Sequence, residues 1–235
     1  NNIQILNANL EKQNLTFKNF YNTSFNFCLK NLMQSGARIE KHDNENIILS
    51  IGDFGFPNWD DKDKEMFSDL NRVGKIVSIN RINKEIKILS KGHRNPQGLI
   101  YLDDKNIIIS TEHGPQGGDE INVNYLDKVY NFGWPMASYG IRYNGENPFV
   151  KNHKDFNFDE PNKFYVPSIA IGQIIKKNNE KNTFLFTSLR ARSIFKIKFD
   201  KDYNKINFEE KYIVGERVRD ILHLKNNLYA VILDS

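Results

Sequence analysis

The sequence predicts an all-β fold, and three observations carry this prediction. A strand–turn–strand pattern occurs in four segments, which begin at Gly36, Gly98, Pro167 and Val218. In each, a short apolar strand meets a polar turn, and a second strand rich in β-branched residues follows. The segments "GKIVSINRINKEIKILS" and "SIFKIKFDKDYNKINFEEKYIV" alternate apolar and polar residues around polar centres, which is typical of β-hairpins. Helix signals, the third observation, are few.

The spacing of the four segments favours a β-propeller. Their first residues lie about 50 to 70 residues apart, which fits a propeller blade with long loops and exceeds the common helical repeats. Polar loops follow equivalent strands in three places: "IGDFGFPNWDD", "TEHGPQGGDE" and "SLRARS". Propellers bind ligands at one end of a central channel, where the loops of successive blades converge. The sequence therefore predicts a ligand site formed by these loops.

One segment has helical character. Residues Asp61 to Val73, "DKDKEMFSDLNRV", suit one or two helical turns, and the acidic start suits a helix N-terminus. The overlapping "DDKDKE" cluster lacks the alternating ligands, central Gly and closing Glu of an EF-hand calcium loop. We interpret it as a solvated loop.

The composition indicates a globular chain. Its 235 residues are 39% hydrophobic and 12% aromatic, enough for one large domain or two small ones. The net charge is +4, but the Lys residues are scattered among acidic ones, so we expect no nucleic-acid partner. No long apolar run predicts a transmembrane segment, and the N-terminus has no signal-peptide pattern. Because the first residue is Asn, a removed export signal stays open. Cys28 is alone, which excludes an intrachain disulfide.

The loop "EHGPQGGDEIN" is the strongest candidate for ligand chemistry. Its glycines permit close backbone approach to a ligand, and Pro115 stiffens the turn. Carbonyl groups turned outward by such a loop suit a hard cation such as Ca2+. The alternative is a glycine-rich turn in which His113 caps its own backbone and Asp119 orders the turn. Spacing alone leaves both interpretations open.

The motifs "GHRNPQGL", "EHGPQGGDEIN" and "NFGWP" together resemble the soluble glucose/sorbosone dehydrogenase family, whose aldose members use pyrroloquinoline quinone (PQQ). The resemblance runs in order from "SGARIEKHDNENIILSIGD" to "GERVRDILHLKNNLYAVILDS". It implies a six-bladed β-propeller that oxidises sugars at C1, with PQQ and Ca2+ at the channel mouth. It also implies a sugar substrate, a separate electron acceptor and a periplasmic or secreted location.

Carried over position by position, the resemblance implies a cofactor-binding set. It assigns Arg94 and Asn95 to the quinone edge, where a guanidinium can stabilise the developing oxyanion. It assigns the carbonyls of Gly114 and Pro115 to Ca2+, which would act as a Lewis acid. The remaining implied cofactor contacts are His113, Ser168, Arg190, Arg217 and Arg219.

Structural alternatives accompany these assignments. Arg217 and Arg219 lie two residues apart, so a strand would point both to one face, where they either bind carboxylates or line a solvated surface. Arg94 either contacts the quinone or pairs with a loop carboxylate. Trp134 is interpreted as packing, with its indole N–H bonded to a loop carbonyl.

The sequence departs from the family at the general base. Where the family pattern resembles "HxGGR", this chain has "QSGAR", which puts Gln34 at the position of the base. A carboxamide does not accept a proton near neutral pH, so we expect poor oxidation or none. His113 is the alternative base. The other histidines belong to loops, turns or outer strands.

The length is the second departure. About 60 residues per blade gives roughly four blades in this chain, where the family has six. Residues 1–235 are therefore predicted to form a single, incomplete propeller domain whose first blade is missing. Two other functions stay open: a non-catalytic propeller that serves as a binding or interaction module, and an incomplete chain without activity of its own.

Overall fold

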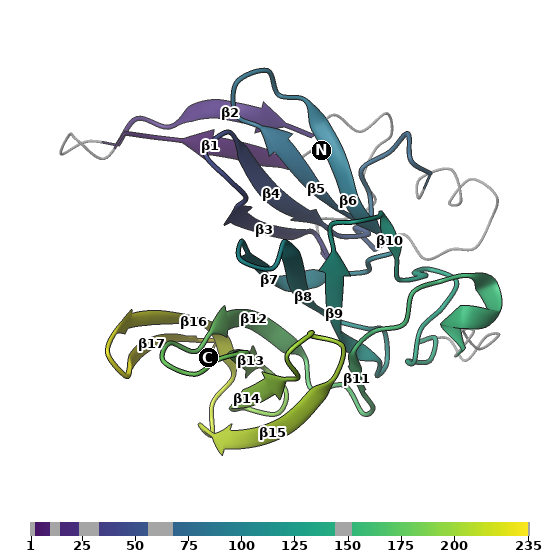
Figure 1. Cartoon of the computed structure of the whole chain (residues 1–235), viewed down its shortest axis with the longest axis vertical. Helices are drawn as coiled ribbons and strands as arrows, with labels where there is room; N and C mark the ends of the chain where they lie inside the picture. The colour runs from purple at the N-terminus through teal and green to yellow at the C-terminus, as the bar shows by residue number, and fades with distance from the viewer. Residues whose placement is uncertain (1–2, 10–14, 24–32, 56–67, 144–151, 235) are drawn as a thin grey trace.

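A computed structural model describes residues 3–9, 15–23, 33–55, 68–143 and 152–234 (Figure 1). These residues contain seventeen β-strands and one 3-10 turn, η1 (His153–Phe156). The all-β prediction is confirmed. Of the predicted helix, residues 61–67 lie outside the described residues and the described part, 68–73, consists of turns and bends. Within the described residues, no helix is long and apolar enough to cross a membrane.

Three sheets follow one another along the chain. The first joins β3 to β6 in antiparallel order and adds β10 parallel to β6: β3 (Gly36–Lys41), β4 (Asn46–Ile51), β5 (Lys75–Asn80), β6 (Ile86–Lys91), β10 (Tyr130–Asn131). The second is β7 (Pro96–Leu102), β8 (Ile107–Glu112), β9 (Asp119–Tyr125), β11 (Lys163–Tyr165). The third is β12 (Ile171–Lys176), β13 (Thr183–Ser188), β14 (Ser193–Phe199), β15 (Ile206–Ile213).

Two-stranded sheets precede and follow these three. They are β1 (Gln4–Asn7) with β2 (Lys18–Asn22), and β16 (Val218–Lys225) with β17 (Leu228–Leu233). The three larger sheets each contain four antiparallel strands, as expected of propeller blades, and the two smaller sheets contain two strands each. The four repeated segments of the sequence correspond to β3–β4, β7–β8, β12–β13 and β16–β17, and the two predicted hairpins are β5–β6 and β14–β15.

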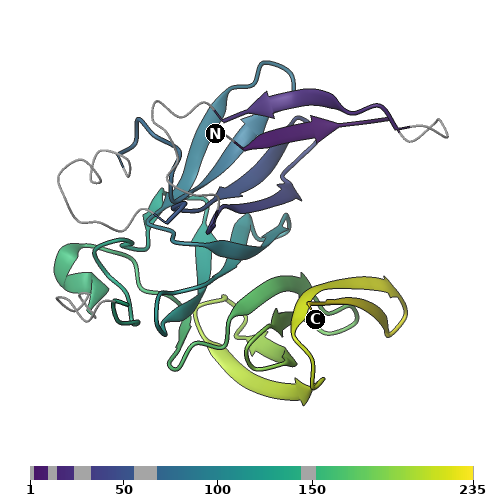
Figure 2. The same ribbon diagram turned by 180° about the vertical axis from the view of Figure 1, so that it is seen from behind.

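The sheets are arranged along an open arc (Figures 1 and 2). The first strands of successive units, β3, β7, β12 and β16, contact one another in that order. Each antiparallel unit therefore starts at the inside of the arc and ends at its outside, which is the arrangement of propeller blades. The loops between units, and those between the second and third strands of a unit, come to the same end of the blades.

The core lies between the sheets. One cluster joins the second and third sheets through buried Ile and Phe side chains such as Ile109, Ile121, Phe184 and Phe186. Burying each contributes about 1.5 to 3 kcal/mol. Because β7 to β9 are covered on both sides by neighbouring sheets, β8 is buried along its whole length. The polar loops at its ends are thereby held on a rigid support.

Candidate functional site

The two glycine-containing motif loops lie side by side at one end of the second sheet. The Arg94 side chain donates from Nη1 to the carbonyls of His113, at 3.1 Å, and Gly114, at 2.7 Å. The His113 N–H donates to the Asn95 carbonyl at 3.1 Å. The resemblance assigns residues of both loops to one cofactor, which requires the loops to be neighbours, and they are. Arg94 bonds carbonyl groups of the neighbouring loop and does not pair with a carboxylate through this nitrogen.

Glu112, the last residue of β8, forms hydrogen bonds with the loop that carries Arg94 and with the neighbouring strand β9. One carboxylate oxygen accepts from the Arg94 backbone N–H at 2.6 Å, and the other lies 2.8 Å from His93 Nδ1 and accepts from the Asn122 amide. The second ring nitrogen of His93 lies 2.8 Å from the hydroxyl of Ser90. His93 is fully buried with both nitrogens bonded, so it is a structural group rather than a base.

Gln34 lies beside Arg94. With its side-chain amide oriented to satisfy both neighbours, its nitrogen donates to Asp53 Oδ1 at 2.7 Å and its oxygen accepts from Arg94 Nη2 at 3.0 Å. The Trp134 indole N–H donates to the other Asp53 oxygen at 2.9 Å. The prediction that this N–H bonds a loop carbonyl was therefore wrong, because the Asp53 carboxylate lies within its reach.

Asp53 is a buried carboxylate that is not among the residues predicted from the sequence. Burial raises its pKa to about 6, although the charge of Arg94 and hydrogen bonds from Gly55 and Trp134 lower it. The signal was present in the sequence: Asp53 and Glu112 each stand near the end of the second strand of a repeated segment, where the polar loops begin. Their contacts with distant residues were not predictable from that position.

Asp119 organises the glycine-rich loop and connects it to the next blade. Its carboxylate accepts from the Gly114 N–H at 3.1 Å, from the Ser168 hydroxyl at 2.8 Å and from the Ile169 and Ala170 N–H groups at 2.9 and 2.6 Å. The interpretation that Asp119 orders its own turn is correct. The Ser168 hydroxyl is used in this network.

His113 is held as a neutral imidazole. Burial lowers its pKa, the positive charges of Arg94 and Arg219 lower it further, and the charge of Asp119 acts in the opposite direction. Its ring also bonds the backbone of Ile171. Arg219, from β16, is therefore close enough to His113 to influence it, as expected for groups at a common channel mouth.

Arg217 and Arg219 share a face, as the spacing predicts. Both guanidinium groups bond Asp234 Oδ2, at 3.1 and 2.6 Å. Arg190 is exposed at the turn between β13 and β14. The structure thus gathers Gln34, Arg94, Asn95, His113, Gly114 and Pro115 in one place, with Arg219 nearby, and it engages Arg217 and Arg219 with an acidic side chain.

The residues fit an anionic, oxygen-rich ligand such as PQQ. Arg94 Nε and His113 Nε2 are buried and have no hydrogen-bond partner among the described residues. The Gly114 carbonyl accepts from Arg94 but retains a second lone pair for a cation. Among the described residues no group of three His, Cys, Asp or Glu side chains forms a metal site, so calcium here would depend on backbone carbonyls and the ligand itself.

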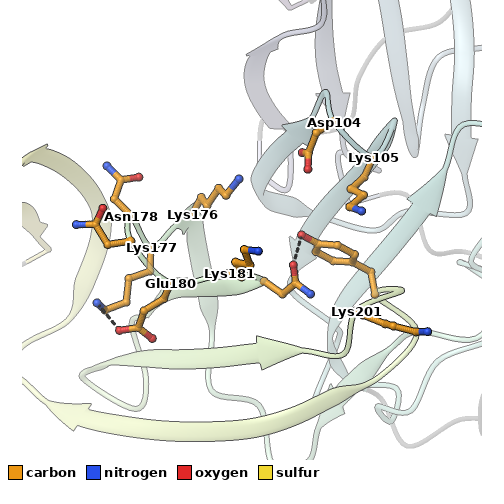
Figure 3. A pocket seen from close by; sticks show the side chains of 11 residues that line it. Asp104, Lys105, Lys176, Lys177, Asn178, Glu180, Lys181 and Lys201 are labelled. Carbon is orange, nitrogen blue, oxygen red and sulfur yellow. Dashed lines mark hydrogen bonds and ion pairs between the residues drawn. The ribbon is translucent and has the colours of Figure 1, made fainter.

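Two cavities differ sharply in character. The one among Arg94, His113, Gly114, Pro115 and Trp134 holds about 10 Å³, room for no more than a water molecule. The space enclosed by these groups is therefore too small for a cofactor. The other, of 860 Å³, lies between the turns that join β7 to β8, β12 to β13 and β14 to β15 (Figure 3). Its lysine-rich turns are at the opposite end of these strands from the motif loops, so we assign it no part in the site.

Comparison with known sequences defines the class of the protein. The family described as glucose/sorbosone dehydrogenase matches residues 1–235, and the chain belongs to this family. A curated relative, the aldose sugar dehydrogenase YliI of Escherichia coli, is 30% identical over 164 residues, covering 65% of this chain and 43% of the relative.

Comparison with solved structures supports the propeller fold. A crystal structure of a glucose dehydrogenase superposes with a TM-score of 0.80 at 21% identity, covering 99% of this chain and 70% of that one. The PQQ-bound aldose sugar dehydrogenase of Streptomyces coelicolor superposes with a TM-score of 0.67 at 18% identity, covering 94% and 62%. The chain spans half the length, or less, of the curated relatives it matches.

Proposed function

We propose that this chain supplies the cofactor-binding part of a PQQ- and Ca2+-dependent aldose dehydrogenase that oxidises sugars slowly or not at all. The observation that carries the proposal is the buried Arg94 guanidinium, fixed on the carbonyls of His113 and Gly114, with its Nε left without a partner among the described residues. Family membership supports the cofactor, and Gln34 at the base position argues against rapid turnover.

When bound, PQQ would accept the hydride from sugar C1, and Ca2+ would polarise the quinone. Arg94 would offer a fixed positive charge to the quinone oxygen, and Asn95 would lie beside it. The carbonyls of Gly114 and Pro115 would hold the cation. Arg190, Arg217, Arg219 and the Ser168 hydroxyl are proposed contacts of the cofactor's carboxylates, for which Arg217 and Arg219 must exchange Asp234 for the ligand.

Proton removal is the weak step of the proposed reaction. Gln34 has no proton-accepting state near neutral pH, and losing the base costs on the order of 10² to 10⁴ in rate. His113 is neutral and its Nε2 has no partner among the described residues, which makes it the alternative base. We further propose residues 1–235 as one propeller domain, a periplasmic or secreted location, and a separate electron acceptor.

A non-catalytic binding module is the second candidate. The observation that favours it is the Gln34 side chain, whose two ends bond Asp53 and Arg94 and which places no proton-accepting group at the position of the base. Under this function the pocket would hold a ligand without reacting with it.

The test is a titration of the protein with PQQ in the presence of Ca2+, followed by the absorbance of the quinone. We expect saturable binding by the wild type and by Arg192→Ala, which changes an exposed turn arginine, and strongly weakened binding by Arg94→Ala. Dye reduction with glucose should be weak, and Gln34→His should increase it. No saturable binding would reject the cofactor site, whereas binding with a rate unchanged by Gln34→His would reject the role assigned to position 34.

A further inference from the structure

The turn before β3 has an unusual backbone. Gln34, Gly36 and Ala37 have φ angles of 60°, 68° and 68°. Residues with a Cβ rarely adopt this left-handed backbone region, and both Gln34 and Ala37 have a Cβ. Such residues persist where the surrounding structure over-determines them, and they cluster at functional sites. The backbone conformation at Gln34 is thus imposed by its neighbours.

The segment after β4 imposes it. Phe54 N–H donates to the Gln34 carbonyl at 3.2 Å, and Asp53 N–H donates to the Arg94 carbonyl at 2.8 Å. Gly52 allows both contacts, because a Cβ there would lie 1.9 Å from the Gln34 carbonyl oxygen. One short segment therefore fixes the backbones of Gln34 and Arg94 relative to each other.

The side chains repeat the same connection. A carboxamide has a donor end and an acceptor end, so it can join a carboxylate to a guanidinium without adding charge. Gln34 does so between Asp53 and Arg94, at 2.7 and 3.0 Å. The guanidinium carbon of Arg94 in turn lies 5.4 Å from the centroid of the Trp134 ring, and Trp134 bonds Asp53. These contacts define one closed group.

We propose that Gln34 is a positioning residue for Arg94: its carboxamide couples the fixed Asp53 carboxylate to the guanidinium and so holds Arg94 ready for an anionic ligand. Position 34 in this chain then orients a cation instead of accepting a proton. The inference rests on the proposed function only in taking the quinone as the ligand of Arg94. Apart from Gln34, the groups that face Asp53 are Arg94, Glu112 and the N–H groups of Gly55 and Trp134.

The first test uses the protein without ligand. Trp134 fluorescence, measured in a Trp59→Phe background, should report the protonation of Asp53, and Asp53→Asn should abolish this transition. Gln34→Met removes a donor to the carboxylate and is expected to raise the midpoint by about one pH unit. An unchanged midpoint would overturn the proposal, because the link between Gln34 and Asp53 would then be absent.

The second test is PQQ affinity in the presence of Ca2+. Gln34→Met should weaken binding about tenfold, since Arg94 loses a charge-assisted hydrogen bond that fixes it. Gln34→His should bind PQQ less tightly at acidic pH, where a protonated imidazole carries no acceptor and repels the Arg94 guanidinium, than above about pH 7.5, where the imidazole is neutral. Thermal unfolding midpoints of each variant separate these effects from loss of folding.

A double-variant comparison separates positioning from space filling. In an Arg94→Lys background, Gln34→Met should cause no further loss of affinity, because its effect passes through the guanidinium. An equal loss in both backgrounds, or equal affinities of wild type and Gln34→Met, would overturn the inference. If the wild type does not bind PQQ, the proposed function fails, and the fluorescence titration still decides whether Gln34 is coupled to Asp53.

Discussion

The hairpins β7–β8 and β16–β17 come from copies of the same sequence repeat but have opposite environments. All six residues of β8 are buried, whereas no residue of β17 is fully buried. The cause is their neighbours: β7 contacts both β3 and β12, while β16 contacts β12 and β13. The local pattern therefore defines the hairpin, and the adjacent sheets decide how much of it is buried.

This difference extends to the two sets of candidate cofactor groups. Arg94 is 6% exposed and is bonded by three separate segments, at Gln34, at Asp53 and at Glu112 to Gly114. The side chains of Arg217 and Arg219, in contrast, are 46% and 41% exposed and share one carboxylate. Groups held in several directions are pre-organised for a ligand, and exposed pairs exchange partners at little cost. We therefore expect the Arg94 region to resist change and the arginine pair to adapt to a ligand.

The largest effect should come from Asp119. Asp119→Ala leaves the Gly114 and Ile169 N–H groups without their acceptor and removes the shorter of the two hydrogen bonds of the Ala170 N–H. It should lower the free energy of unfolding by about 3 to 5 kcal/mol. Urea unfolding measures it, with the exposed Asp127→Ala as control. Asp234→Ala, in the arginine pair, should cost far less. Similar losses of unfolding free energy in Asp119→Ala and Asp234→Ala would contradict the expected difference between the two regions.

The sequence predicts what is local in this molecule. The hairpins were predictable because each depends on a turn and on alternation within about twenty residues. The meeting of the two motif loops followed from the family resemblance. Contacts between distant residues were not predictable: Trp134 bonds Asp53 across 81 positions, and Asp119 bonds Ala170 across 51. In both cases the polar side chains are common loop residues, and only the packing of blades makes them partners.

The second prediction concerns Asp53 and pH. Because its folded-state pKa of about 6 lies above its ordinary value of 3.8, the folded state retains a proton that the unfolded chain has released. The cost of burying the charge therefore develops as the pH rises through this window and is complete above it. Relative to wild type, the Asp53→Asn variant should gain up to about 3 kcal/mol of unfolding free energy as the pH rises from acidic to neutral. Urea unfolding at several pH values measures the gain, and parallel stability curves would contradict it; Asp103→Asn, at an exposed position, is the control.

A third prediction contrasts two glycines. Gly52→Ala places a Cβ 1.9 Å from the Gln34 carbonyl and should cost about 2 to 3 kcal/mol of unfolding free energy, because backbone must move. Gly215, between β15 and β16, has open space where a Cβ would lie, so Gly215→Ala should cost only the roughly 1 to 2 kcal/mol of its left-handed backbone. Chemical denaturation of both variants measures the difference. A larger loss at Gly215 would show that the open region is as tightly constrained as the site.

The smallest change in stability should come from replacing Arg38, which connects the two regions. Arg38, on β3, donates to Asp220 on β16 at 2.7 Å and to the Gln97 carbonyl on β7 at 2.6 Å. It therefore joins the inner strand of the first sheet to the exposed hairpin, 182 positions away. Both side chains of this pair are about a quarter exposed, so Arg38→Met should cost about 1 kcal/mol.

The destabilisation caused by Arg38→Met should be confined to the β16–β17 hairpin. Since β16–β17 is covered on one side only, hydrogen exchange of its amides should quicken about fivefold in Arg38→Met, while amides of β7 to β9 stay protected. Arg81→Met, which removes a single bond to a turn carbonyl, is the matched control and should leave both regions unchanged. Equal acceleration in both regions would mean that they open together, because the sheets around the site would then unfold as one unit with the exposed hairpin.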